Sequence, residues 1–253
     1  MAFLNVDQIN KHFINERKEE INALSDLTFL CHDGEFLCLL GPTGCGKTTI
    51  LRIISGLEQP DNGQVLVNEQ GVHGINQEST LVFQQYSLFP WRNVIDNIAF
   101  GLEMRNINRT KRYARAQEFI DLVGLRGFEK AFPYELSGGM QQRAAIARAL
   151  AYDKRLILMD EPFGALDERT RHRLQEELLN IWRQQRKTII FVTHNIDEAI
   201  FLADRILIMH DRPGYVENEL KIVLPRPRDR KSPDFIKLHI GIREVLEDML
   251  NSG

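Results

Sequence analysis

Residues 41–48 read GPTGCGKT, and this segment restricts the possible folds of the chain more than any other. An apolar run, residues 36–40, precedes it, and a helical pattern follows it. The apolar residues on one face of that pattern are Ile50, Ile53, Ile54 and Leu57. Strand, glycine-rich loop and helix in this order are the context in which such a pattern holds phosphate. The glycines let successive backbone N–H groups point at an anion, and the helix N-terminus adds partial positive charge.

We interpret this segment as a phosphate-binding loop for a nucleotide. Lys47 would neutralise the β- and γ-phosphates, and the Thr48 hydroxyl would ligate Mg²⁺. The alternative is a chance glycine turn with a surface lysine, but the flanking strand and helix favour phosphate binding. We also expect the Cys45 thiol to be open to thiol reagents. The residues expected to bind nucleotide are Gly41, Pro42, Thr43, Gly44, Cys45, Gly46, Lys47, Thr48 and Thr49.

The bulk composition narrows the class of protein. The 253 residues fit one large domain or two small ones, and the net charge of −3 gives no general attraction to nucleic acid. No apolar run approaches the ~18 residues that span a bilayer, and the segment MAFLNVDQINKHF lacks a signal-peptide layout. We therefore expect the protein to stay where it is made, where ATP is available. The odd number of cysteines without C-x-x-C pairing disfavours a disulfide framework or zinc site.

Phe13 is the candidate for contact with the base of the nucleotide. A strand-like lead with Phe3, Val6 and Ile9 comes before it, a polar insert spans residues 15–22, and a strand pattern resumes over residues 23–30. An aromatic side chain ahead of a phosphate loop can stack on a base. The alternative is that Phe13 packs at the edge of the sheet, and the residues alone leave both interpretations open.

Polar side chains stand at the ends of three further predicted strands. Gln84 follows the strand 80–83, Asp160 and Glu161 end the buried strand 156–161, and His194 follows the strand 188–193. In a parallel sheet the carboxyl ends of the strands carry the site. Gln84 could reach Mg²⁺, Asp160 fits a Mg²⁺-linked role through Thr48 and water, and Glu161 fits a general base that polarises the attacking water.

His194 could hydrogen-bond a γ-phosphate. Each of these side chains also has a simpler interpretation. Gln84 would be a polar loop residue, the two carboxylates would be surface acids, and His194 would be structural.

Residues 90–153 have a helical pattern throughout, and we interpret them as a helical insertion between strands of an α/β core. Within them, Ser137 is a natural N-cap followed by Gly138 and Gly139. We interpret this as a second helix N-terminus that holds an anion. A plain capped helix would explain the serine but not both glycines.

The tail changes character at residues 225–231, a basic proline-rich segment that we interpret as a linker. An amphipathic helix is predicted after it, and we expect this helix to pack on the domain or on a partner. Acidic residues mixed into its polar side disfavour membrane insertion. The apolar side consists of Phe235, Leu238, Ile242, Val245 and Met249.

Taken together, these motifs resemble the nucleotide-binding subunit of an ABC transporter over almost the whole chain. They are GPTGCGKT (41–48), a strand ending in Gln84, LSGGMQQR (136–143), LILMDEP (156–162), ALD (165–167) and His194. The family's usual signature is LSGGQ, whereas here Met140 takes the fifth position and Gln141 follows. Phe13 stands where the family usually has a base-stacking tyrosine, but no glycine follows it closely.

The resemblance implies the fold and its division. We expect one ABC ATPase domain of α/β class, with a P-loop NTPase (RecA-like) core, an N-terminal antiparallel β subdomain and an inserted α-helical subdomain. The core would comprise residues 1–87 and 156–224. The helical subdomain with the signature would comprise residues 88–155, and residues 225–253 would form the linker and C-terminal helix.

The resemblance also implies a mechanism in which two copies of the chain face each other head to tail. One copy would hold ATP and Mg²⁺ through the phosphate loop, Gln84, Asp160 and His194, and Glu161 would activate water. The other copy would close on the γ-phosphate with its signature, and Asp167 would lie at the contact between subunits. The signature residues are Ser137, Gly138, Gly139 and Gln141.

Three segments resemble the nitrate/sulfonate/taurine group of bacterial importers: YSLFPW (86–91), DEPFGALD (160–167) and LPRPR (224–228). In this group a membrane permease subunit would dock near residues 84–91, although core packing could also explain the aromatic residues. A separate solute-binding protein would deliver the solute, no nucleic acid would be bound, and the chain would lie peripherally on the cytoplasmic side of the membrane.

A soluble ABC ATPase acting on ribosomes or DNA is the alternative, although neither a second cassette nor a long coiled coil is present. A GTPase or small-molecule kinase is disfavoured because the sequence has no N-K-x-D motif.

Overall fold

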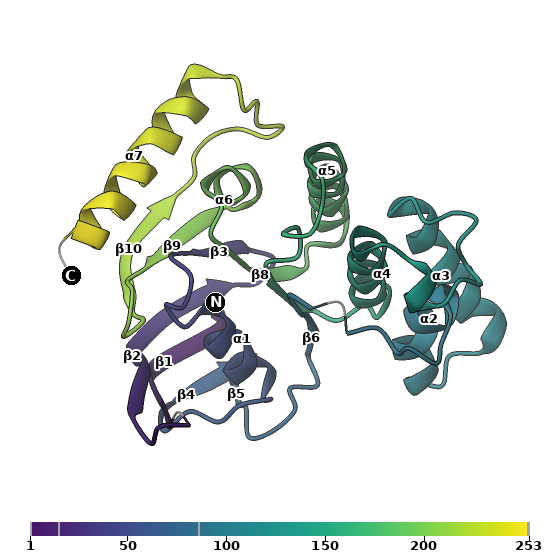
Figure 1. The fold of residues 1–253 in the computed structure, drawn as a ribbon, viewed down its shortest axis with the longest axis horizontal. Helices are drawn as coiled ribbons and strands as arrows, with labels where there is room; N and C mark the ends of the chain where they lie inside the picture. Colours follow the sequence, from purple (N-terminus) through teal and green to yellow (C-terminus); the bar gives the residue numbers. More distant parts are fainter. Residues whose placement is uncertain (1, 15, 86, 252–253) are drawn as a thin grey trace. The chain divides into compact units, whose positions relative to one another are not determined.

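The structure is a computed structural model that describes residues 2–14, 16–85 and 87–251. The chain forms two compact units (Figure 1). The first unit combines Met1–Glu78 with Arg186–Gly253, and the second comprises Ser79–Gln185. Within the described ranges, no helix has both the length and the apolarity needed to cross a bilayer.

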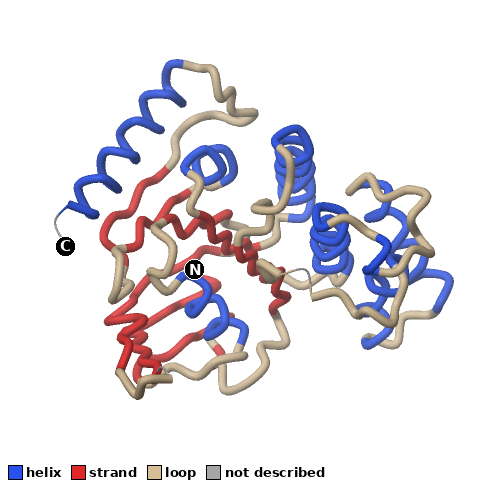
Figure 2. The backbone as a smooth tube through the Cα atoms, in the orientation of Figure 1, coloured by secondary structure: helices blue, strands red, loops and turns tan. Residues whose placement is uncertain are grey.

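An antiparallel sheet begins the first unit (Figure 2). Its strands are β1 (Ala2–Ile14), β2 (Glu20–His32), β4 (Asn62–Val67) and β5 (Gln70–Gly71), in the order β2-β1-β4-β5. The hairpin β1–β2 is longer than predicted, because His12 pairs with Asn22 and Phe13 with Ile21. Polar residues can continue a strand whose side chains reach water, so the polar insert of the sequence is shorter than expected.

The first unit also contains a mainly parallel set of strands. These are β10 (Val216–Lys221), β9 (Arg205–Met209), β3 (Phe36–Leu40) and β8 (Thr188–Thr193), paired in that order. β3 runs parallel to both neighbours and is buried along its whole length, which confirms the prediction for residues 36–40. β10 was not predicted because its sequence, VENELK, shows little of the alternation by which a half-buried strand is recognised.

Where the structure describes the first unit, its helices are α1 (Lys47–Ser55), α6 (Ile196–Leu202) and α7 (Pro233–Asn251). α1 ends at Gly56, whose φ of 74° makes a left-handed C-cap. Leu57 therefore lies beyond the helix and is 50% exposed, so its prediction as part of the buried face was wrong. Ile50, Ile53 and Ile54 are buried as predicted.

The basic segment before α7 is folded against the end of α6. The Arg228 guanidinium is buried and donates to the carbonyl oxygens of Ile200 at 2.5 Å and Ala203 at 2.6 Å. Arg230 pairs with Asp197 at 2.7 Å and lies 3.6 Å from the centre of the Phe201 ring. The last carbonyl groups of a helix lack partners within the helix, and cations there also interact favourably with its dipole. The segment predicted to be a linker is thus fixed on α6, where Arg228 caps the end of the helix and Arg230 pairs with Asp197 in its first turn.

α7 packs back on the first unit, where it contacts α6. Phe235 and Ile242 on its predicted apolar side are buried, and Leu238, Val245 and Met249 are half-buried. Of the two interpretations of the tail helix, packing on the domain is therefore confirmed.

Apart from residue 86, which is not described, the second unit consists of a pair of parallel strands and the helical segment. The strands are β6 (Ser79–Val82) and β7 (Leu156–Asp160). The helices are α2 (Val94–Met104), α3 (Arg109–Leu122), the 3₁₀ helix η1 (Pro133–Glu135), α4 (Gly138–Ala151) and α5 (Glu168–Gln185). Asn93, Asn108 and Ser137 cap three of these helices with their side chains. No strand occurs between residues 90 and 153, all of which are described, as the sequence predicts.

Replacing Arg228 by methionine should destabilise the protein. The substitution keeps an apolar stem of similar length but leaves buried carbonyl oxygens at the end of α6 without a donor, a cost of about 1–3 kcal/mol. The free energy of unfolding in urea measures the effect. Arg243→Met is the matched control, because Arg243 forms an exposed pair with Glu247 on α7 and should cost less than ~0.5 kcal/mol. Equal losses in the two variants would contradict the capping role.

Candidate functional site

The predicted phosphate loop connects β3 to α1. Gly44 and Gly46 have φ of 93° and 94°, in the left-handed region that favours glycine. Gly46 is also the N-cap of α1, and a Cβ atom there would lie 2.5 Å from Leu24 Cδ2 and 2.8 Å from Ala23 O. Both the backbone conformation and the space around it therefore require glycine at this position.

The lysine of the loop is held inside it. Lys47 is 5% exposed, and its ammonium group donates to the carbonyl oxygens of Gly41 at 2.8 Å and Pro42 at 2.6 Å. The side chain starts in the first turn of α1, so its charge adds to that of the helix N-terminus. The loop thus combines a positive charge with backbone N–H groups, which is the chemistry needed to bind phosphate. Thr43, Gly44 and Thr48 are exposed, and Thr49 is half-buried.

Cys45 does not have the accessible thiol that the sequence suggested. Its side chain is fully buried, and burial raises the pKa of the thiol despite the nearby Lys47 ammonium. Both effects lower reactivity, because the thiolate is the reactive form. All three cysteines of the chain are free and buried.

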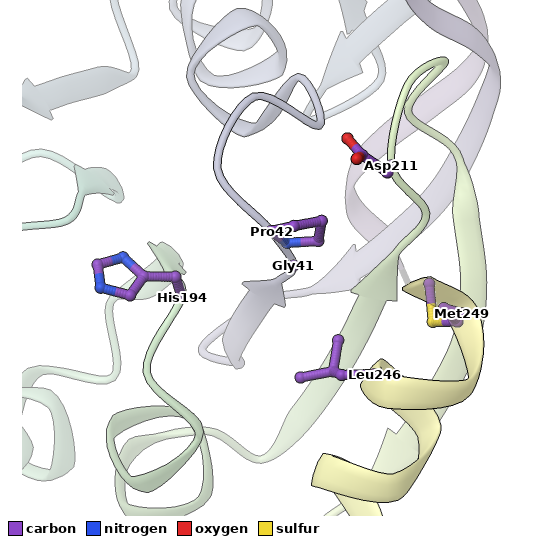
Figure 3. A pocket seen from close by; sticks show the side chains of 6 residues that line it. All are labelled: Gly41, Pro42, His194, Asp211, Leu246 and Met249. Carbon is purple, nitrogen blue, oxygen red and sulfur yellow. The ribbon is translucent and has the colours of Figure 1, made fainter. Parts of the chain in front are cut away.

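The structure brings His194 next to the start of the phosphate loop. Together they line a cavity of about 120 Å³ (Figure 3). The other lining residues are Asp211, after β9, and Leu246 and Met249, from the end of α7. Parallel strands β3 and β8 end side by side, which explains why Gly41 and His194 meet. Sequence reasoning found the apolar face of α7 but had no signal for its position beside this loop.

In the second unit, the two carboxylates stand at the end of β7 as predicted. Asp160 is 4% exposed and ends the strand. Glu161 has a φ of 44°, a backbone conformation that is uncommon for residues other than glycine and concentrates at functional sites. The Gln84 amide donates to the Glu161 carboxylate at 3.4 Å. The structure therefore brings together two side chains that the sequence assigned to the same reaction.

The predicted anion site at the start of α4 has the expected local geometry. Ser137 caps the helix, its hydroxyl accepting from Met140 N at 3.4 Å. A Cβ atom at Gly139 would meet only ordinary contacts, the nearest being Leu166 Cδ2 at 3.5 Å. Packing among the described residues thus does not explain this glycine, which favours close approach by another molecule. The Gln141 amide donates to Leu136 O at 3.2 Å.

Asp167, predicted to lie at a subunit contact, has a local role as well. It precedes α5, and its carboxylate accepts from Thr170 N at 3.0 Å. This hydrogen bond is the main cause that lowers the pKa of Asp167, so the side chain remains charged at neutral pH. A subunit contact remains a prediction for this exposed residue.

Phe13 lies at the end of β1 and is 38% exposed. The Lys11 ammonium lies 5.2 Å from the centre of its ring and is held there by Glu58 at 2.8 Å and Gln59 O at 2.8 Å. A cation beside the ring is a favourable arrangement that stabilises its position. The ring is thus neither buried nor fully exposed, and base stacking remains a prediction.

The aromatic segment of residues 87–91 lies beside a groove of the second unit. Phe89 packs against Phe100 and Trp91, with ring centres 4.5 and 5.6 Å apart, and Arg148 lies 5.5 Å from the Phe89 ring centre. The groove has a volume of about 370 Å³ and includes Phe89 and Phe100, while Trp91 is 72% exposed. Tyr86, the first residue of the predicted docking motif, lies outside the described residues.

Known proteins resemble this chain over most of its length. A family model described as ABC transporter matches residues 24–164. An uncharacterized ABC transporter ATP-binding protein of Methanocaldococcus jannaschii is 49% identical over 97% of this chain and 91% of its own. The nitrate import ATP-binding protein NrtD of Synechocystis is 41% identical, over 96% and 94%. An aliphatic sulfonates import ATP-binding protein SsuB of Bacillus cereus is 40% identical, over 96% of each chain.

A solved structure confirms the predicted fold class. A dimeric ATP-binding cassette bound to ADP and Pi, in a post-hydrolysis state, superposes with a TM-score of 0.80. It is 31% identical and covers 88% of this chain and 100% of its own. The family model spans more than half of the chain, and the relatives match nearly all of it. The chain therefore belongs to the ABC transporter family and is an ABC ATPase.

Proposed function

We propose that the chain is the ATP-hydrolysing subunit of a bacterial importer for a small solute such as nitrate, a sulfonate or taurine. One observation carries this proposal. Relatives named for nitrate import and for aliphatic sulfonates import align with 96% of the chain at 41% and 40% identity. These alignments reach well beyond the family model, which ends at residue 164.

The phosphate loop holds the β- and γ-phosphates of ATP. Lys47 then exchanges its hydrogen bonds to Gly41 and Pro42 for phosphate oxygens, which charge-assisted hydrogen bonding favours. His194 bonds the γ-phosphate, and its position at the same cavity as Gly41 and Pro42 supports this role. Phe13 stacks on the adenine.

Mg²⁺ is the metal that the residues fit. Thr48, Gln84 and Asp160 offer hydroxyl, amide and carboxylate oxygens, which are the hard ligands that Mg²⁺ prefers, with Asp160 acting through a water molecule. Thr48 is exposed in the first turn of α1, and Gln84 and Asp160 stand at or near the ends of β6 and β7. When bound there, the ion would supply positive charge that offsets the charge of the phosphates.

Glu161 is the general base. Its carboxylate polarises the water that attacks the γ-phosphorus, and the hydrogen bond from Gln84 orients the carboxylate. The uncommon backbone conformation of Glu161 supports a functional rather than a structural reason for its position.

A second copy completes the site. Ser137, Gly138, Gly139 and Gln141 of that copy close on the γ-phosphate, and Asp167 lies at the contact. The exposed Ser137 at a helix N-terminus and the uncrowded Gly139 support this role. Similar cassettes have been solved as dimers.

The chain works at the cytoplasmic face of the membrane, where its aromatic segment receives a permease subunit. The groove beside Phe89 and the exposure of Trp91 support this docking surface. A solute-binding protein brings the solute to the permease, so this chain does not itself bind the solute.

Replacing Glu161 by glutamine should leave ATP binding intact and lower the steady-state ATPase rate by about 100-fold or more, because an amide cannot accept the proton. ATP turnover and the fraction of dimer in the presence of ATP are the measurements. Glu176→Gln, an exposed acid on α5, is the control and should keep the normal rate. A normal rate in Glu161→Gln would remove Glu161 from the reaction.

The shared site can be tested by mixing two inactive variants. Ser137→Arg should bind ATP without hydrolysing it, and Lys47→Ala should fail to bind ATP. In a heterodimer, one site would combine the intact phosphate loop of the first variant with the intact signature of the second. Activity should therefore return in the mixture. If the sites act independently, each heterodimer should reach about half the activity of an unmodified dimer, whereas mutations at unrelated sites would simply add their losses. No recovery at any mixing ratio would contradict the shared site.

Docking on the permease is tested by co-purification from membranes. Trp91→Ala should reduce retention of the chain by the permease subunit, because an exposed tryptophan is typical of an interface anchor. Phe128→Ala is the matched control, since Phe128 is also an exposed aromatic residue of the second unit but lies outside the proposed docking segment, residues 84–91. If no membrane subunit is recovered even with the unmodified chain, a soluble ABC ATPase would be favoured instead.

A further inference from the structure

A short loop after β9 is fixed against the phosphate loop; we name residues 210–215 the bracing loop. Its ends are joined by a hydrogen bond of 3.0 Å from His210 N to Tyr215 O, and the two rings stack with centres 4.7 Å apart. Gly214 N donates to Ala23 O, and Ser25 N donates to Gly214 O, both at 3.1 Å. The bracing loop is thus tied to β2 by backbone hydrogen bonds.

The bracing loop touches two successive carbonyl groups of the phosphate loop. Arg212 Nε donates to Gly44 O at 3.0 Å. A Cβ atom at Gly214 would lie 2.0 Å from Cys45 O, so that carbonyl group also turns toward the bracing loop. Asp211, the neighbour of Arg212, lines the cavity beside Gly41 and Pro42 (Figure 3).

These two contacts decide where the N–H groups of the phosphate loop point. A trans peptide is planar, and its N–H group points opposite to its carbonyl group. With the carbonyl oxygens of Gly44 and Cys45 turned toward the bracing loop, the N–H groups of Cys45 and Gly46 point away from it. Cys45 N lies 3.5 Å from Pro42 O, a long and weak hydrogen bond that a phosphate oxygen can replace.

We propose that Arg212 is a positioning residue of the ATP site, which holds the Gly44 carbonyl group outward so that the following N–H groups face the phosphates. This inference rests on the proposed binding of ATP phosphates by residues 41–48. Arg212 acts through the backbone of the phosphate loop. The position of its Nε atom is therefore essential, and its charge is not.

Three substitutions separate the hydrogen bond from the charge. Glutamine places its amide nitrogen at the same position along the side chain as Arg Nε, so Arg212→Gln keeps the donor and loses the charge. Lysine has carbon at that position, so Arg212→Lys keeps the charge and moves the donor one atom further out. Arg212→Met has neither. The three variants keep a similar length of side chain, and all leave Lys47 and Thr48 unchanged.

The measurements are the dissociation constant of ATP for each purified full-length variant and the KM and kcat of its ATPase reaction. Loss of one hydrogen bond should weaken ATP binding about two- to tenfold. In Arg212→Met and Arg212→Lys, this weaker binding should raise the dissociation constant and KM and leave kcat nearly unchanged. Arg212→Gln should stay close to the unmodified protein in all three quantities. Thermal unfolding midpoints show whether a variant is folded. If Arg212→Met is not folded, the comparison of Arg212→Gln with Arg212→Lys still shows whether ATP binding depends on the hydrogen bond or on the charge.

Two outcomes would overturn the proposal. Normal binding in Arg212→Lys with weakened binding in Arg212→Gln would mean that the charge acts on the nucleotide directly. Unchanged binding in all three variants would mean that the hydrogen bond has no role. Lys47→Ala serves as the reference for a lost site. If the unmodified protein binds ATP no better than Lys47→Ala, the proposed function fails, and the role of Arg212 fails with it.

Discussion

The concave backbone of residues 41–48 is the constraint on which the first unit depends. A loop that turns N–H groups toward an anion needs left-handed conformations at Gly44 and Gly46, and at Gly46 the neighbouring atoms leave no room for a Cβ atom. The neighbouring atoms come from β2, from β9 and from the bracing loop, through Leu24, Met209 and Gly214. The antiparallel sheet and the parallel strands therefore both contact the loop, which gives a structural reason for their association.

Arginine side chains hold the first unit together at points where apolar packing alone would leave backbone groups without partners. Arg228 satisfies carbonyl oxygens at the end of α6, and Arg205 bridges Glu35 at 2.8 Å and Glu219 at 2.9 Å between strands. A planar guanidinium with several donors suits such positions, because one side chain can bind more than one oxygen. The arginine contacts of residues 225–231 fold the tail back, and the end of α7, with Leu246 and Met249, lies beside the phosphate loop and His194.

Much of the candidate site follows from local pattern. The runs around residues 36–48, 156–161 and 188–194 each combine an apolar strand with polar residues at its end, and strands were found in all three. Errors came where a local pattern was incomplete or misleading. Leu57 fits the helical period of α1, but Gly56 ends the helix, and Cys45 sits in a polar motif yet is buried. The arginines of residues 225–231 suggest a solvated linker, but their partners are distant in sequence.

The family and the identity of the phosphate loop followed from the sequence alone, because each depends on short-range spacing of residues. The tertiary structure decided which distant groups meet. It joined Gly44 to Arg212, which lie 168 residues apart, and it brought Gly41, His194 and Met249 to one cavity. No local signal encodes such contacts, because they depend on the pairing of β3 with β8 and β9 and on the packing of α7 against α6.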